Sequence, residues 1–159
     1  MSQVIDGFQR GDAAVIGPRM EALLDAGQQV TLQISGDSMR PTLKPRLDAA
    51  VLEKLSAWPP RRGDILFFKR ENGEYVLHRV RRVKEDGAIM NGDAQNWTEG
   101  PVTRDMAIAK AVALVRKGRV VDVNAPLYRA YVACWFVTRP IRWPLLAAWR
   151  AIKRLLGGK

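Results

Sequence analysis

Alternating apolar and polar side chains dominate the first three quarters of this chain. Residues 30–34 alternate in this way, which predicts a strand with one buried face. Residues 65–69 and 75–83 are rich in aromatic and branched side chains, and the Glu-Asn-Gly-Glu stretch between them is typical of a hairpin turn. Further strands are predicted at residues 48–55, 88–90, 106–115 and 119–123. The pattern therefore predicts a mainly β fold, a small antiparallel barrel-like sheet.

Near the amino terminus, residues 18–26 are expected to form a short helix, with Pro18 at its start and Gly27 where it stops. Charged side chains interrupt residues 1–27, so no apolar run there has the length of a membrane span. We therefore expect neither a signal peptide nor an amino-terminal anchor. The expected location is the cytoplasm or the cytoplasmic face of a membrane.

After Pro126 the pattern changes. Residues 127–137 are apolar and aromatic, but this run is much shorter than a membrane-spanning helix, and Arg139-Pro140 ends it. From Trp143, helical spacing predicts a basic amphipathic helix. Its apolar face would carry Leu145, Ala148, Trp149, Ile152 and Leu156, with Arg150 and Arg154 opposite. Such a helix either packs on its own domain or attaches to a membrane surface, and the pattern leaves both alternatives open.

Composition divides the 159 residues into two parts, a body of residues 1–125 and a helical extension of residues 126–159. The net charge is +10, and residues 116–159 hold ten of the basic side chains but only one acidic one. We expect the segment 127–157 to make any contact with an anionic membrane. Nucleic acid is not an expected partner, because neither a helix-turn-helix pattern nor zinc-ligand spacing is visible. The lone Cys134 excludes an internal disulfide.

Ser38 and His78 are the candidate reactive pair. A serine hydroxyl by itself is a poor nucleophile, and a neutral imidazole within hydrogen-bond reach can remove its proton near neutral pH. Ser38 lies in the string Gly-Asp-Ser-Met-Arg-Pro-Thr-Leu, and His78, the only histidine, lies in Tyr-Val-Leu-His-Arg-Val. One histidine and one cysteine make a poor metal-ligand set, so we expect no metal and no organic cofactor.

These two strings, together with Arg-Gly-Asp-Ile-Leu-Phe-Phe at 62–68 and Asn-Gly-Asp-Ala-Gln at 91–95, occur in the order seen in a known family. Over residues 30 to 115 the chain resembles the signal-peptidase and LexA-like superfamily of serine proteases. A histidine in place of the catalytic lysine is similar to the archaeal and endoplasmic-reticulum branch. The resemblance implies a signal-peptidase-type sheet, Ser38 as nucleophile, His78 as general base and Asp93 as the carboxylate that orients the imidazole.

By the same resemblance, the loop around Ser38 forms the oxyanion site and the wall of the substrate groove. The Ser38 N–H is one expected oxyanion donor. Some family members supply a second donor from a hydroxyl two residues before the nucleophile, where this chain has Gly36. Met39 is expected to wall the groove, while Asp37 either tunes the local field or serves the turn. The implied substrate is an extended peptide with small side chains near the cleaved bond.

Each candidate residue also has a purely structural interpretation. Ser38 and Asp93 occur in compositions typical of turns, and His78 has the setting of a half-buried strand residue. The order of the four strings favours catalysis for Ser38 and His78, and to a smaller extent for Asp93. Glu99 and Asp105 are the nearest further acids, and neither matches the family position cleanly.

The favoured hypothesis is a serine endopeptidase with a Ser–His dyad assisted by Asp93. The first alternative is a non-catalytic module on the same scaffold that binds a peptide or a membrane. The second is a self-cleaving protein, for which Ala13-Ala14 and Ala26-Gly27 are weak candidate cleavage sites.

Overall fold

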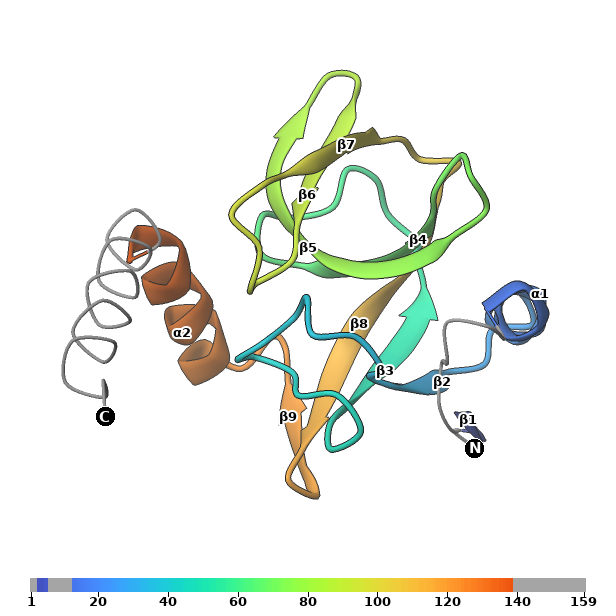
Figure 1. The fold of residues 1–159 in the computed structure, drawn as a ribbon, viewed down its shortest axis with the longest axis horizontal. Helices are drawn as coiled ribbons and strands as arrows, with labels where there is room; N and C mark the ends of the chain where they lie inside the picture. Colours follow the sequence, from blue (N-terminus) through green and yellow to red (C-terminus); the bar gives the residue numbers. More distant parts are fainter. Residues whose placement is uncertain (1–2, 6–12, 139–159) are drawn as a thin grey trace, which may run out of the picture.

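The computed structural model describes residues 3–5 and 13–138 (Figure 1). Strands alternate with turns through most of the chain, and one helix lies near each end of the described part. In chain order the elements are β1 Gln3–Ile5, α1 Ala13–Asp25, β2 Val30–Gln33, β3 Ala49–Lys54, β4 Ile65–Lys69, β5 Tyr75–Lys84, β6 Gly87–Asn91, β7 Glu99–Val102, β8 Ala107–Arg116, β9 Arg119–Asp122 and α2 Pro126–Val137. The prediction of a mainly β fold is confirmed.

The nine strands of the described residues form one sheet in the order β1-β2-β3-β8-β4-β5-β6-β7, with β9 paired to β8. All pairs are antiparallel except β1 and β2. The sheet does not close into a barrel, so the barrel-like form expected from the sequence is wrong. A sheet closes into a barrel only when its two edge strands pair with each other. That pairing depends on contacts between distant segments, which the alternation of side chains does not encode.

Strand β4 is buried on both of its faces and separates two apolar cores. Ile65 and Phe67 belong to the larger core, whereas Leu66 and Phe68 belong to the smaller one. Successive side chains of a strand point to opposite faces, so a strand buried on both sides is apolar at every position rather than at every second one. The sequence Ile-Leu-Phe-Phe has this pattern, and its first four residues are all buried.

Helix α1 begins five residues earlier than the pattern predicted, and Pro18 lies inside it. Its end is as expected, because Gly27 has a positive φ of 74° and closes the helix. The Gly27 N–H donates to Leu24 O and the Gln28 N–H donates to Leu23 O, each at 3.0 Å. These two bonds form a Schellman motif, which favours glycine at its left-handed position.

Helix α2 packs on the sheet domain, at the other side of the molecule from α1 (Figure 1). Tyr128 and Val132 are buried in the larger core. The Tyr131 hydroxyl lies 2.9 Å from that of Thr42, which comes from the loop between β2 and β3. The part of the carboxyl-terminal extension that is described is therefore bound to the body. The predicted amphipathic helix that begins at Trp143 lies outside the described residues.

No helix in the described ranges is both long and apolar enough to cross a membrane. Strands β1 and β7 were not predicted from the sequence. The β7 sequence, Glu-Gly-Pro-Val, contains the two residue types that are least favourable in strands, and β7 lies at the end of the strand order, where proline is tolerated.

Candidate active site

The candidate site is organised by two neighbouring residues of β5, His78 and Arg79. Because side chains alternate along a strand, the two project to opposite faces of the sheet. His78 lies on the face of the smaller core, where its ring centroid is 6.3 Å from that of Phe68. Arg79 lies on the face of the larger core, beside Tyr128 of α2. Each of the two is bound to a different carboxylate.

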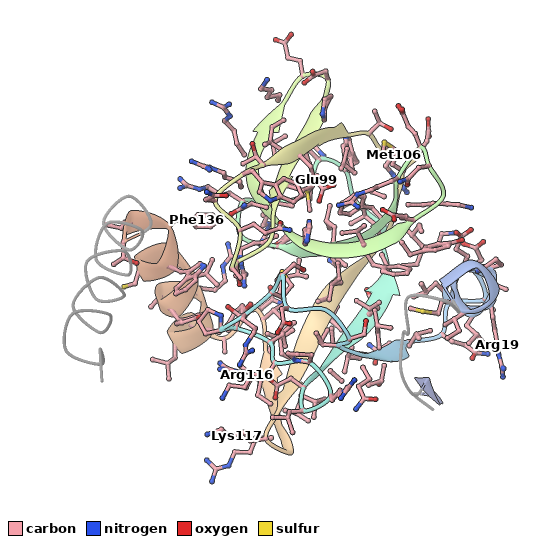
Figure 2. The ribbon with its side chains drawn as sticks, in the orientation of Figure 1. Arg19, Glu99, Met106, Arg116, Lys117 and Phe136 are labelled. Atoms are coloured by element: carbon pink, nitrogen blue, oxygen red, sulfur yellow. The ribbon has the colours of Figure 1, made fainter. Side chains whose placement is uncertain are left out.

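The His78 imidazole is held by Glu99, at the start of β7 and labelled in Figure 2. Its Nδ1 is hydrogen-bonded to Glu99 Oε1. A carboxylate accepts, so this contact selects the tautomer that carries its proton on Nδ1. Trp97 meets the imidazole edge-on, with the ring centroids 6.5 Å apart. His78 is only 2% exposed, and in the described part of the chain its Nε2 has no hydrogen-bond partner.

Glu99 is itself fixed from its other oxygen. Arg70, in the turn between β4 and β5, donates to Glu99 Oε2 from Nε at 2.7 Å, and its Nη2 lies 2.7 Å from the same oxygen in an ion pair. Burial is the largest single influence and acts to raise the pKa of Glu99, but the hydrogen bonds to His78 and Arg70 act against it and the net pKa is lowered. Glu99 is therefore an ionised carboxylate in contact with the imidazole at neutral pH.

Asp93 does not occupy the orienting position that was predicted for it. Its Oδ1 and Oδ2 accept hydrogen bonds from Arg79 Nε at 2.8 Å and Nη2 at 2.7 Å. The Arg79 Nη1 donates to Gly63 O at 2.9 Å and to the Tyr128 hydroxyl at 3.1 Å. Burial acts to lower the pKa of Arg79, but the hydrogen bonds and charge of Asp93 raise it overall. Asp93 therefore belongs to a buried structural ion pair, and Glu99 is the acid next to His78.

Ser38 lies in the loop between β2 and β3 and is partly buried. Its backbone oxygen accepts a hydrogen bond of 2.8 Å from the Ala94 N–H. The approach is so close at Gly92 that a Cβ there would lie 2.7 Å from the same oxygen. The loop carrying Ser38 is thus pressed against residues 92–98, the connection between β6 and β7. Glycine permits this contact because it has no side chain.

The remaining residues of the Ser38 loop differ in burial. Met39 is buried in the larger core, so it supports the loop from beneath and belongs to the core rather than to an open groove wall. Gly36 and Asp37 are exposed. The Asp37 carboxylate accepts from Arg40 at 3.1 Å in an exposed ion pair. Pairs of this kind contribute little to stability, and Asp37 therefore has a local role in the turn.

The connection 92–98 links the two reactive candidates. It contacts the Ser38 backbone through Ala94 and the His78 ring through Trp97. The Asn91 side chain holds this connection in shape by donating to the backbone oxygens of Gln95 and Trp97. Among the described residues, no hydrogen bond joins the Ser38 hydroxyl to the His78 imidazole.

Sequence patterns did not identify Glu99, Arg70 or Trp97 as members of the site. Glu99 was noted only as a nearby acid, and it precedes a Gly-Pro pair, a composition typical of turns. Arg70 adjoins the hairpin turn, where an exposed arginine is common. No strong sequence signal marks Glu99 or Arg70. The acid and the base become neighbours only when β7 and the β4–β5 turn meet in the folded chain.

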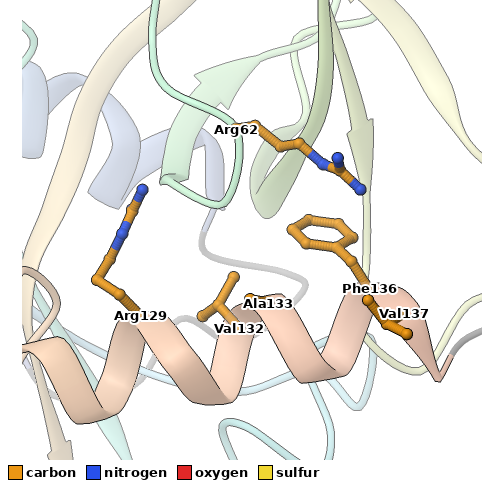
Figure 3. Close-up of a pocket in the computed structure, with 6 residues that line it drawn as sticks. All are labelled: Arg62, Arg129, Val132, Ala133, Phe136 and Val137. Carbon is orange, nitrogen blue, oxygen red and sulfur yellow. The ribbon is translucent and has the colours of Figure 1, made fainter.

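A second feature is a shallow groove of about 230 Å³ along α2 (Figure 3). It is lined by Arg62, Arg129, Val132, Ala133, Phe136 and Val137. The Arg62 guanidinium lies 4.5 Å from the centre of the Phe136 ring, and Arg129 forms a 3.4 Å ion pair with Asp64. Val137 and Leu127 are 74% and 85% exposed.

Within the described ranges, no three histidine, cysteine, aspartate or glutamate side chains are grouped so that they could hold a metal ion. Comparison of the chain with protein-family models and with curated proteins finds no match. Inference about function therefore rests on the residues and their geometry.

Proposed function

We propose that this protein is a serine endopeptidase in which Ser38 is the nucleophile, His78 the general base and Glu99 the orienting carboxylate. The observation that carries the proposal is the state of the imidazole. A carboxylate holds Nδ1, and Nε2 is free of partners among the described residues, as a general base requires. The order of the four sequence strings supports a fold of the signal-peptidase type.

In the proposed reaction, the Ser38 Oγ attacks the carbonyl carbon of the substrate peptide bond while His78 Nε2 accepts the hydroxyl proton. The negative oxygen of the tetrahedral intermediate is stabilised by the Ser38 N–H. The imidazolium, stabilised by Glu99, then donates its proton to the leaving amine as the C–N bond breaks. A water molecule, deprotonated by His78, hydrolyses the acyl-enzyme and regenerates Ser38.

This mechanism requires the Ser38 hydroxyl to come within hydrogen-bond reach of Nε2 in the substrate complex. The backbone bond between Ala94 and Ser38 and the ring contact between Trp97 and His78 place both residues against one short connection. The proposed dyad would form when the substrate complex brings these two side chains together. Such contacts often tighten only when substrate is bound.

An extended peptide with small side chains near the cleaved bond is the proposed substrate class, as the resemblance implies. Strand pairing with an unpaired backbone edge would hold such a peptide in register. His78 is deeply buried, so the substrate carbonyl must approach from the side of the Ser38 loop.

The test is covalent labelling of the full chain with a fluorophosphonate probe, followed by mass spectrometry of the modified peptide. We expect modification at Ser38 that is lost in Ser38→Ala and reduced at least about a hundredfold in His78→Ala. Ser35→Ala is the matched control, because Ser35 is an exposed serine in the same loop. Labelling of Ser38 at an unchanged rate in His78→Ala would reject the proposal.

The groove on α2 favours a second proposed activity, peripheral binding to an anionic membrane. Exposed apolar side chains beside cations are typical of interfacial attachment, and the groove combines Val137 with Arg62 and Arg129. We expect the full chain to sediment with vesicles that contain phosphatidylglycerol but not with phosphatidylcholine vesicles. Arg62→Glu/Arg129→Glu should weaken this binding. Binding that is the same for both vesicle types would exclude the electrostatic attachment.

Self-cleavage is less well supported. Ala26-Gly27 lies in the hydrogen-bonded turn that ends α1, and Ala13-Ala14 lies at the start of that helix. Ala26-Gly27 would have to leave its turn, and Ala13-Ala14 would have to leave the helix, before either segment could become extended. An unchanged intact mass after prolonged incubation is the expected result.

A further inference from the structure

Arg70 connects the candidate site to the β4–β5 turn. Its Nη1 donates to Glu74 Oε2 at 2.7 Å, while its Nε donates to Glu99 Oε2 and its Nη2 forms an ion pair with the same oxygen. Glu99 in turn contacts His78 through Oε1. The four side chains form a continuous series in which acid and base alternate, from the surface to the buried imidazole.

The two carboxylates of this series are placed very differently. The Glu74 side chain is 51% exposed, whereas that of Glu99 is 15% exposed. An exposed ion pair is screened by water, and a buried one is screened much less. The interaction of Arg70 with Glu99 is therefore the stronger one, and its charge-assisted hydrogen bond from Nε holds the carboxylate oxygen Oε2 in place.

We propose that Arg70 is a positioning residue of the active site, which acts through Glu99 on the general base His78. It has two effects. The hydrogen bond from Nε and the ion-pair contact of Nη2 hold Oε2 in place, so Oε1 stays on Nδ1 of the imidazole. The positive charge also reduces the affinity of Glu99 for a proton, so the Nδ1 proton remains on the ring. The inference rests on the proposed function and adds a residue to its machinery.

Few other charges act on this carboxylate. In the described residues, the groups that face Glu99 are His78 from β5 and Arg70 from the β4–β5 turn, and Glu74 faces the far side of Arg70. The neighbouring rings around His78, Phe68 and Trp97, are uncharged. Among the described residues, Arg70 is the one arginine or lysine that contacts Glu99. Its removal would therefore leave His78 as the remaining partner of this carboxylate.

The single histidine makes a direct test possible, because its imidazole gives an unambiguous signal in the ¹H–¹⁵N NMR spectrum of the full chain. In the wild type we expect the proton on Nδ1. In Arg70→Gln, Glu99 loses the ion pair and the Nε hydrogen bond that hold its carboxylate, so the population with the proton on Nδ1 should be less uniform. Arg70→Lys keeps the charge but loses the Nε hydrogen bond, and its spectrum should lie between those of the wild type and Arg70→Gln.

Lys54→Gln is the matched control. It removes a surface ion pair of 2.6 Å with Asp25, remote from the site, and should leave the imidazole spectrum unchanged. A purely structural role for Arg70 predicts a lower melting temperature with an unchanged imidazole spectrum. That outcome, obtained with Arg70→Gln and Arg70→Lys both folded, would overturn the inference.

The rate of fluorophosphonate labelling at Ser38 completes the test. Arg70→Gln should label about tenfold more slowly than the wild type at the same pH. If His78→Ala abolishes labelling but Arg70→Gln changes neither labelling nor the spectrum, the positioning role fails and the proposed function stands. If labelling is independent of His78 while the spectrum responds to Arg70, the proposed catalysis fails and the contact network stands.

Discussion

The two faces of β5 carry the same pairing of a basic side chain with an acid, yet the two pairs differ in almost every other property. Arg79 is 1% exposed, and four of its five N–H groups donate to Asp93, Gly63 and Tyr128. His78 is equally buried, but only one of its nitrogens is bound among the described residues. We call Arg79 and Asp93 the saturated pair, because most of the Arg79 N–H groups and both Asp93 oxygens are hydrogen-bonded. Such a pair stabilises a fold, whereas an imidazole with one free nitrogen can accept a proton.

The difference explains why the sequence alone suggested the wrong acid. Asp93 stands in a string that resembles a catalytic one, and in the structure it belongs to the saturated pair. Glu99 lacks a recognisable setting and belongs to the pair that contains His78. The same side-chain chemistry therefore serves stability on one face and, in our proposal, catalysis on the other.

The largest expected effect comes from breaking the saturated pair. Arg79→Met leaves the Asp93 carboxylate buried without its partner, and it should lower the free energy of unfolding by about 3–5 kcal/mol. Denaturation in urea, followed by circular dichroism, measures the loss. The double variant Arg79→Met/Asp93→Leu should recover most of it, because no charge is then left buried. A loss below about 1 kcal/mol in the single variant would be inconsistent with a buried structural pair.

The second prediction separates the two acids by activity. Glu99→Gln removes the charge that stabilises the imidazolium and permits the wrong tautomer, so labelling of Ser38 should slow by about a hundredfold or more. Its unfolding free energy should change little. Asp93→Asn should show the opposite pattern, with reduced stability and a near-normal labelling rate in the folded fraction. The reverse outcome would return the orienting role to Asp93.

A smaller effect is expected from α2, whose Tyr128 hydroxyl accepts a hydrogen bond from Arg79. Tyr128→Phe removes the hydroxyl that accepts from Arg79 and should cost about 1.5–2 kcal/mol of unfolding free energy. Tyr131→Phe, which removes the contact with the Thr42 hydroxyl, is the matched control and should cost about 1 kcal/mol. Equal losses in the same urea titration would show that the bond to Arg79 has no special weight.

The smallest expected effect is on the stability of the protein at acidic pH. The pKa of Glu99 is lowered in the folded protein, since its hydrogen bonds to His78 and Arg70 outweigh the effect of burial. Its contribution to stability is complete above the pKa of the unfolded chain and is lost as the pH falls through the lower folded value. Between about pH 6 and pH 3, the wild type should therefore lose more unfolding free energy than Glu99→Gln, by less than about 1 kcal/mol. An equal loss in both proteins would contradict the assignment.

Much of the fold could be predicted because strands and turns leave local patterns. The prediction for residues 65–69 coincides with β4, and that for 75–83 differs from β5 by one residue. Gly27 stops α1 as expected, because the turn it forms involves only neighbouring residues. The start of α1 and the strand β7 were missed. Tolerance of Pro18 inside a helix, and of Gly-Pro in an edge strand, depends on surroundings that a local pattern does not contain.

By itself, the sequence determined that His78 and Arg79 project to opposite faces, because side chains in any strand alternate with a period of two. It also placed Ser38 in a tight loop and the strand boundaries around it. Only the tertiary structure decided which acid meets which base. Asp93 and Glu99 lie six positions apart. Glu99 is paired with Met90 of the smaller core by the register of β6 and β7, whereas Asp93 lies in the connection between these strands and meets Arg79. The alternation of apolar side chains specifies which face of a strand is buried, but it does not specify which acid of this segment meets which base.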